Sequence, residues 1–124
     1  WDVSNVTNMK GMFRSAESFI GEGLEFWDVS SVTNMNHLSA GAINFNGDVS
    51  NWDVSSVTDM TYMFYYAESF NQDISGWDVS NVTNFYAMFD SINDLSDSNK
   101  CAIDISFSHN ENWEYDWDEY CSDD

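Results

Sequence analysis

Apolar residues recur along this chain with a period of about 25 residues, and polar residues fill the positions between them. Four tryptophans anchor the pattern, and each opens a copy of the sequence Trp-Asp-Val-Ser-x-Val-Thr: Trp1, Trp27, Trp52 and Trp77. Other valine, methionine, phenylalanine and alanine positions keep the same offset from the tryptophan in nearly every copy. One copy has too few apolar residues to enclose a core, so we expect the copies to stack on one another.

Inside each copy the pattern predicts one short helix and one short strand. Met60, Met63, Phe64 and Ala67 have helical spacing after Thr58, a candidate N-cap, and the second copy departs from this spacing at His37-Leu38-Ser39. An apolar residue between polar ones precedes two of the tryptophans, which is typical of a strand. The pattern thus predicts helices over 9–16, 60–67 and 85–92 and strands over 47–50 and 72–75. A connection of roughly twenty residues between consecutive strands requires them to run parallel.

A strand, a turn and a helix in 25 residues is the content of a leucine-rich repeat. The segments 52–64 and 70–77 closely resemble the repeat of BspA-like bacterial surface proteins, and the resemblance covers about residues 1 to 106, departing at 20–26. It implies a solenoid displayed outside the cell, with adhesion or structural roles and no catalytic residues. The expected fold class is an α/β repeat solenoid, a leucine-rich-repeat-like right-handed coil of short parallel strands and helices over residues 1–95. A final strand and an acidic helical cap are expected over residues 96–124.

The cap is predicted where the repeat register ends, after Leu95. The segment 104–106 resembles one more strand, and Ser108 with Glu111 has the spacing of a capping box ahead of a helix that ends at Cys121. A disulfide between Cys101 and Cys121 would fasten this cap and would indicate an oxidising compartment. Two free thiols or a metal site are the alternatives, and zinc is disfavoured because the chain has no Cys-x-x-Cys.

Charge and composition exclude several classes of partner. The chain has 22 acidic and three basic residues, a net charge of −19, which argues against nucleic acid and against an anionic membrane surface. An aromatic content of 17% argues against disorder. No apolar run approaches the roughly 20 residues that cross a bilayer, so we expect no membrane insertion within this stretch, and no signal peptide opens it.

The aspartates that follow the tryptophans are candidate metal ligands. Asp28, Asp53 and Asp78, with Asp2, would bring like charges together if the copies stack. Either each carboxylate caps its own turn, or calcium lies between the copies. Calcium is the one cofactor considered.

The outward face of the predicted strands is the expected binding surface. It carries acidic and hydroxyl groups that suit a basic protein patch or a cation-bridged glycan, or that simply keep the surface solvated: Asp48, Ser50, Asp73, Ser75 and Asp104. Tyrosines on the opposite side either add exposed aromatic rings or pack between copies: Tyr62, Tyr65, Tyr66 and Tyr86.

Asn5 and Asn81 satisfy the N-glycosylation rule, but the motif follows from the repeat itself. No phosphate loop, nucleophile elbow or metal-binding His/Glu pair is present, so we expect no enzyme; a glycoside hydrolase or lyase is the competing class.

The expected function is an extracellular or cell-surface module that binds a protein or glycan ligand in adhesion. The alternative is a structural subunit of a filament or surface layer. Trp1 opens within a repeat, so the apolar face of the first copy either meets further copies upstream or self-associates with another chain.

Overall fold

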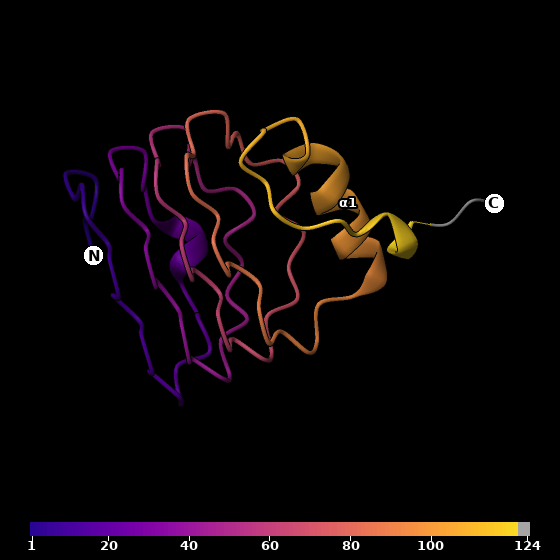
Figure 1. Cartoon of the computed structure of the whole chain (residues 1–124). Helices are drawn as coiled ribbons and strands as arrows, with labels where there is room; N and C mark the ends of the chain where they lie inside the picture. The colour runs from indigo at the N-terminus through magenta and orange to yellow at the C-terminus, as the bar shows by residue number, and fades with distance from the viewer. Residues whose placement is uncertain (122–124) are drawn as a thin grey trace.

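Four stacked copies and a C-terminal segment make up the computed structural model, which describes residues 1–121. The named elements are the 3₁₀ turn η1 (Leu24–Phe26), the helix α1 (Asp97–Phe107) and the 3₁₀ turn η2 (Asp118–Tyr120). Successive copies lie side by side as loops of similar outline, and α1 lies at the end of the stack (Figure 1). None of the helices in residues 1–121 has the length and apolar character needed to cross a bilayer.

Backbone hydrogen bonds join each copy to the next at equivalent positions. The amide of Met35 donates to the carbonyl of Asp59 at 3.0 Å, and the amide of Met60 donates to Asn84 at the same distance. Isolated parallel bridges mark the same contact through all four copies: Asn8 to Asn34, Asn34 to Asp59 and Asp59 to Asn84. Residues 25 or 26 positions apart in sequence therefore become neighbours.

The predicted α/β fold class is wrong. Across residues 1–121 the bridges are isolated, no bridge extends into a sheet, and α1 is the one α-helix. Neither the leucine-rich-repeat assignment nor the right-handed solenoid of short strands and helices is supported by this structure. The copies consist of turns and irregular backbone instead.

The predicted helix over 60–67 fails because its backbone groups pair with the next copy. The amides of Tyr62 and Phe64 donate to Tyr86 and Met88, while the amide of Met63 closes a turn onto Met60. Backbone φ is +57° at both Tyr62 and Tyr66, a left-handed value that interrupts an α-helix. The apolar spacing correctly indicates which residues are buried, but the neighbouring copy offers the backbone a different set of partners. The same pattern replaces the predicted helix over 9–16. Residues 85–92 form turns instead, with positive φ at Ala87 and Ser91, and the amide of Phe89 donates to the hydroxyl of Tyr115.

The predicted strands over 47–50 and 72–75 are irregular segments that lead into turns at 50–51 and 75–76. The Asp48 carboxylate accepts hydrogen bonds from the amide and hydroxyl of Ser50, and the Asp73 carboxylate accepts one from the amide of Ser75. The carbonyl of residue 49 then accepts the amide of Trp52. Aspartate side chains that bond to the backbone two residues ahead compete with strand pairing, which explains the failure.

One hydrophobic core runs through the copies and into α1. Phenylalanine rings stack inside it between copies and within them: the centroids are 6.1 Å apart for Phe45 and Phe70 of successive copies and 4.0 Å apart for Phe64 and Phe70 of the third copy. Trp52 and Trp77 are buried, and their indole N–H groups donate to the carbonyls of residues 24 and 49, each of which lies three residues before the tryptophan that opens the preceding copy. The aromatic residues therefore link adjacent copies through both packing and hydrogen bonding.

The C-terminal segment covers the last copy in a different way from the prediction. Helix α1 begins after Ser96, whose hydroxyl accepts the amide of Asn99, and its C-cap is Ser108, which the sequence had indicated as an N-cap. The predicted strand over 104–106 lies inside α1, where Ile103 and Phe107 are buried at helical spacing.

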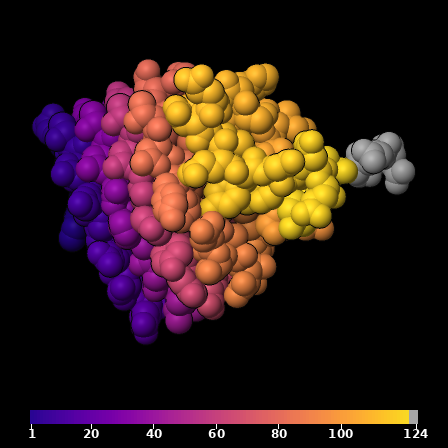
Figure 2. Space-filling model, in the orientation of Figure 1, coloured from indigo at the N-terminus to yellow at the C-terminus, as the bar shows by residue number. Residues whose placement is uncertain are grey.

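The predicted helix ending at Cys121 is reduced to η2, because the aromatic residues ahead of it pack at alternate positions. Trp113, Tyr115 and Trp117 all lie against the Phe89 ring, and the hydroxyl of Tyr115 accepts the Phe89 amide. This segment spreads across the end of the stack (Figure 2). The last residues of the predicted cap, 122–124, lie outside the described residues.

Candidate ligand-binding groove

The residues predicted for a binding face are exposed or half-buried turn residues, with one exception. Asp48 and Asp73 bond to serines of their own turns, so part of their capacity to accept hydrogen bonds is already used. These hydrogen bonds, the side-chain bond first, lower the pKa of Asp48. The exception is Asp104, which is buried in α1 and accepts the indole N–H of Trp113. The five residues therefore do not form one surface.

The aspartates proposed as calcium ligands adopt the turn-capping arrangement. Asp28 and Asp53 each accept hydrogen bonds from the hydroxyl and the amide of the serine two residues ahead, and Asp78 accepts the corresponding amide. These bonds lower the pKa of all three carboxyls, even though neighbouring aspartates raise that of Asp53. Within residues 1–121, the three do not converge closely enough to share an ion.

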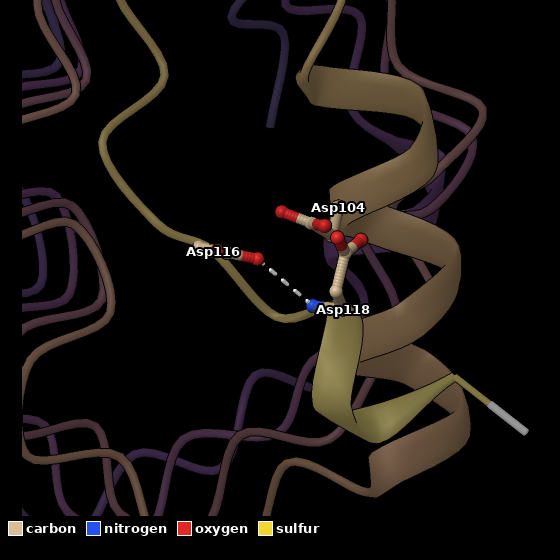
Figure 3. Close-up of side chains that lie close together, drawn as sticks. All are labelled: Asp104, Asp116 and Asp118. Atoms are coloured by element: carbon tan, nitrogen blue, oxygen red, sulfur yellow. Dashed lines mark hydrogen bonds between the residues drawn. The ribbon is translucent and has the colours of Figure 1, made fainter.

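A different group of three carboxylates does converge. One oxygen from each of Asp104, Asp116 and Asp118 lies within 4.8 Å of the other two, as Figure 3 shows. Asp104 comes from α1, and Asp116 accepts the backbone amide of Asp118 ahead of η2. Carboxylate oxygens are ligands for hard divalent cations. Sequence reasoning missed this group, since the proximity depends on the chain returning to α1.

The disulfide explains that return. Cys101 in α1 and Cys121 after η2 are bonded, with Cα atoms 5.0 Å apart, so the predicted pairing is confirmed. The bond fixes the end of the described chain against the helix.

One glycosylation candidate has a structural role. Asn5 and Asn81 are both exposed, but the side-chain amide of Asn81 donates to the carbonyl of Ser55 at 2.7 Å. A glycan on that nitrogen would disturb a contact between copies, which favours the interpretation that the motif is a by-product of the repeat.

A groove of about 240 Å³ lies across the first three copies, on the side of the tyrosines. Its walls come from positions ten, thirteen and fourteen residues after the tryptophans, and its principal lining residues are Arg14, Ser15, His37, Gly41, Tyr62, Tyr65 and Tyr66. The imidazole of His37 stacks on the Tyr62 ring with centroids 4.6 Å apart, and the rings of Tyr65 and Tyr66 meet edge to face at 4.7 Å. Equal offsets in three copies therefore line one groove, to which the third copy contributes the three tyrosines and the second copy the His37 ring.

The backbone under these rings has the left-handed conformation that favours glycine. Positions ten and fourteen residues after a tryptophan have positive φ in every copy, and glycine occupies them at Gly11 and Gly41. The third copy has tyrosine at both, Tyr62 and Tyr66, where a side chain with a Cβ is conformationally costly. Residues other than glycine occupy six of these eight positions, including Ser15, Ala87 and Ser91, so the backbone conformation alone does not distinguish the tyrosines. Their distinctive feature is that their rings pack together at the groove.

The groove also has an unusual charge for this protein. Arg14 lies in its lining, and burial, followed by the charges of Arg14 and Lys10, lowers the pKa of His37. The imidazole is therefore neutral at pH 7; its Nδ1 donates to the side-chain oxygen of Asn36, which leaves Nε2 as an acceptor for a ligand. Together the groove presents aromatic faces, hydroxyl groups, a neutral imidazole and one guanidinium, which suits binding of a small polar ligand.

Sequence reasoning named the tyrosines but missed Arg14 and His37. The available signal was the register itself: aligned on their tryptophans, the copies place Arg14 and Tyr65 at one offset and His37 and Tyr62 at another.

Comparisons with known proteins place the chain in a family. No curated protein and no solved structure matches it. Residues 1–101 match the family described as "Mycoplasma protein of unknown function, DUF285". Because this match spans most of the 124 residues, the chain belongs to the DUF285 family.

Proposed function

We propose that this chain is a non-catalytic binding module of a cell-surface or extracellular protein, and that it acts in adhesion by holding a glycan in the groove. The observation that carries the proposal is the cluster of rings that lines the groove, Tyr62, Tyr65 and Tyr66, beside the half-buried His37. Protein–protein interfaces typically bury about 800 Å² per partner. A groove of about 240 Å³ suits one sugar ring better than a protein surface.

Two further features support a location outside the cell. A disulfide persists in oxidising compartments, and Cys101 and Cys121 form one. The segment 52–64 resembles the repeats of BspA-like surface proteins.

The chain itself supplies matched variants for a test. Replacing Tyr62 and Tyr66 by glycine copies Gly11 and Gly41, which occupy the same two offsets in other copies. Glycine relieves the left-handed backbone while the rings are lost, so we expect the melting temperature to stay within about 3 °C of wild type. Phe26→Ala, which removes a ring that is 85% exposed outside the groove, is the control.

The assay is binding of purified protein to an immobilised panel of neutral and carboxylated oligosaccharides. Wild type and the Phe26 variant should bind the same members, and the double glycine variant should bind them at least about tenfold more weakly, since aromatic contacts in such pockets are lost. Absence of binding by wild type, or equal binding by the double glycine variant, would refute the proposal.

A second candidate function, a structural subunit that assembles end to end, rests on the face of the first copy. An apolar hollow of about 420 Å³ lies there, lined mainly by Trp1, Phe13, Phe19, Leu24 and Trp27. Among residues 1–121, no hydrogen bond reaches the carbonyls of residues 8, 10, 12 and 14, whose equivalents in the second copy all accept amides. This face therefore offers both the apolar surface and the acceptors that one more 25-residue unit would use.

Electron microscopy and sedimentation velocity test this second candidate. Assembly through the face predicts fibres or dimers in wild type, and their loss in Phe19→Lys, which places a charge in the hollow. Dispersed monomeric particles of wild type at all concentrations would exclude it.

A further inference from the structure

The position of Arg14 indicates the charge of the ligand that the groove binds. The chain has only three basic residues against 22 acidic ones, and Arg14 is the one that lines this groove. Lys100 lies elsewhere, with its ammonium over the ring of Tyr120. Within residues 1–121, the Arg14 guanidinium has neither a hydrogen-bonded partner nor an acidic group in ion-pair contact. An unpaired guanidinium in such an acidic protein leaves its carboxylate-binding geometry available.

Other hollows on the molecule lack this feature. Three larger ones, of about 420 to 500 Å³, have no Lys or Arg in their lining. One of them is lined by Glu22, Glu25 and Asp48, which would repel an anion. In a protein with a net charge of −19, the groove beside Arg14 is therefore the hollow where a negative ligand is favoured.

The aromatic rings of the groove indicate what the uncharged part of the ligand is. Tyr62 stacks on His37, and Tyr65 meets both Tyr62 and Tyr66 edge to face, so several ring faces and edges border a small space. Aromatic faces cover the C–H face of a pyranose ring, while phenol hydroxyls and a neutral imidazole match its hydroxyl groups. Pockets for drug-sized ligands usually measure about 300–1,000 Å³. At about 240 Å³ this groove has room for a single sugar ring.

We propose that the groove binds a carboxylated monosaccharide unit, such as a uronic or sialic acid within a glycan. Its carboxylate pairs with the Arg14 guanidinium, and its ring lies against Tyr62 and the neighbouring tyrosines. This inference rests on the proposed glycan-binding function and adds the chemical class of the sugar.

The test compares sugars that differ only in the acid group. Methyl glucuronoside is paired with methyl glucoside, and sialyllactose with its neutral methyl ester, in titrations followed by the NMR signals of the tyrosine rings. Wild type should bind the carboxylated member of at least one pair about tenfold more tightly, with the preference reduced by 0.5 M salt. Arg14→Gln should lower this affinity to that for the neutral member. Arg14→Lys should retain part of the preference, because lysine keeps the charge but loses the bidentate geometry.

The outcomes separate this inference from the proposed function. Equal binding of acidic and neutral sugars by wild type, lost in the Tyr62→Gly/Tyr66→Gly variant, would overturn the carboxylate assignment and leave glycan binding intact. Unchanged acidic-sugar affinity in Arg14→Gln would also overturn the assignment. If wild type binds no member of either pair and none of the wider panel, both fail. Arg14 is exposed, so its substitution should leave the melting temperature unchanged, which serves as the folding control.

Discussion

Replacing Trp52 by phenylalanine tests how strongly adjacent copies hold together. Trp52 is 4% exposed, and its indole N–H donates at 2.8 Å to the carbonyl of Leu24, three residues before the tryptophan that opens the preceding copy. An indole buries roughly 50 Å² more apolar surface than a phenyl ring, which is worth about 1 kcal/mol at about 25 cal/mol per Å². The lost hydrogen bond adds about 1 kcal/mol. The Leu24 carbonyl keeps its bond from the Trp27 amide, so no larger penalty for an unpaired group applies.

The expected loss is therefore about 2 kcal/mol, equivalent to a fall of roughly 6–8 °C in melting temperature for a chain of this size. Urea unfolding followed by circular dichroism, with the slope compared to wild type, measures it. Trp77→Phe should cost the same, because Trp77 is equally buried and bonds to Val49 in the same way. Trp27→Phe should cost clearly less, since its ring is half-buried and its indole N–H has no acceptor within residues 1–121. Equal losses at all three tryptophans, or none at Trp52, would refute this reasoning.

Three other predictions concern conditions and the C-terminal end. The carboxyls of Asp28 and Asp53 have lowered pKa values because serines donate hydrogen bonds to them. These carboxylates therefore stabilise the fold above about pH 4, and the stabilisation is lost as the pH falls through their folded pKa. Melting temperatures measured across acid pH should show this loss, and the loss should be smaller in Asp53→Asn than in wild type. Reduction of the disulfide, or a Cys101→Ser/Cys121→Ser variant, should lower the unfolding free energy by about 3 kcal/mol, and an unchanged urea midpoint would count against it. A chelator should leave the wild-type melting temperature unchanged, because serines of the same turns already donate hydrogen bonds to the carboxylates of Asp28 and Asp53. A clear fall in the melting temperature would reveal a bound ion.

The tryptophan register predicts which residues meet, but it does not predict how the backbone pairs. Buried positions such as Met60 and Phe64 follow directly from the apolar spacing. The hydrogen bond that Asp53 accepts from Ser55 in its own turn matches one of the two alternatives that the sequence left open for this aspartate. The spacing of Met60, Met63, Phe64 and Ala67 fits a helix equally well in an isolated segment. Only the neighbouring copy, which accepts the amides of residues 62 and 64, decides against it.

The C-terminal error has a similar origin. Trp113 and Trp117 are four residues apart, which indicates a helix, but with Tyr115 they also alternate at every second position. The end of the stack exposes the Phe89 ring and amide, and the alternating arrangement places all three side chains against them. Sequence periodicity alone does not distinguish the helical arrangement from the alternating one, because the surface that selects between them, around Phe89, belongs to the fourth copy.

The groove was partly predictable from the same alignment of copies. Tyrosines 62, 65 and 66 stand out as surface aromatics, but their combination with Arg14 and His37 requires knowing that three copies lie in register. The left-handed backbone at Tyr62 and Tyr66 was less evident in the sequence. The indication was that glycines occupy the same offsets in the first two copies.

Hydrogen-bond scalar couplings measured by NMR test the register of the copies most directly. The register of the structure predicts couplings from the amide nitrogen of Tyr62 to the carbonyl carbon of Tyr86 and from Phe64 to Met88, because these groups are bonded at 2.8 and 2.9 Å. Couplings from the amide of Phe64 to the carbonyl of Met60, as in an α-helix, would contradict it and would separate the residues that form the groove.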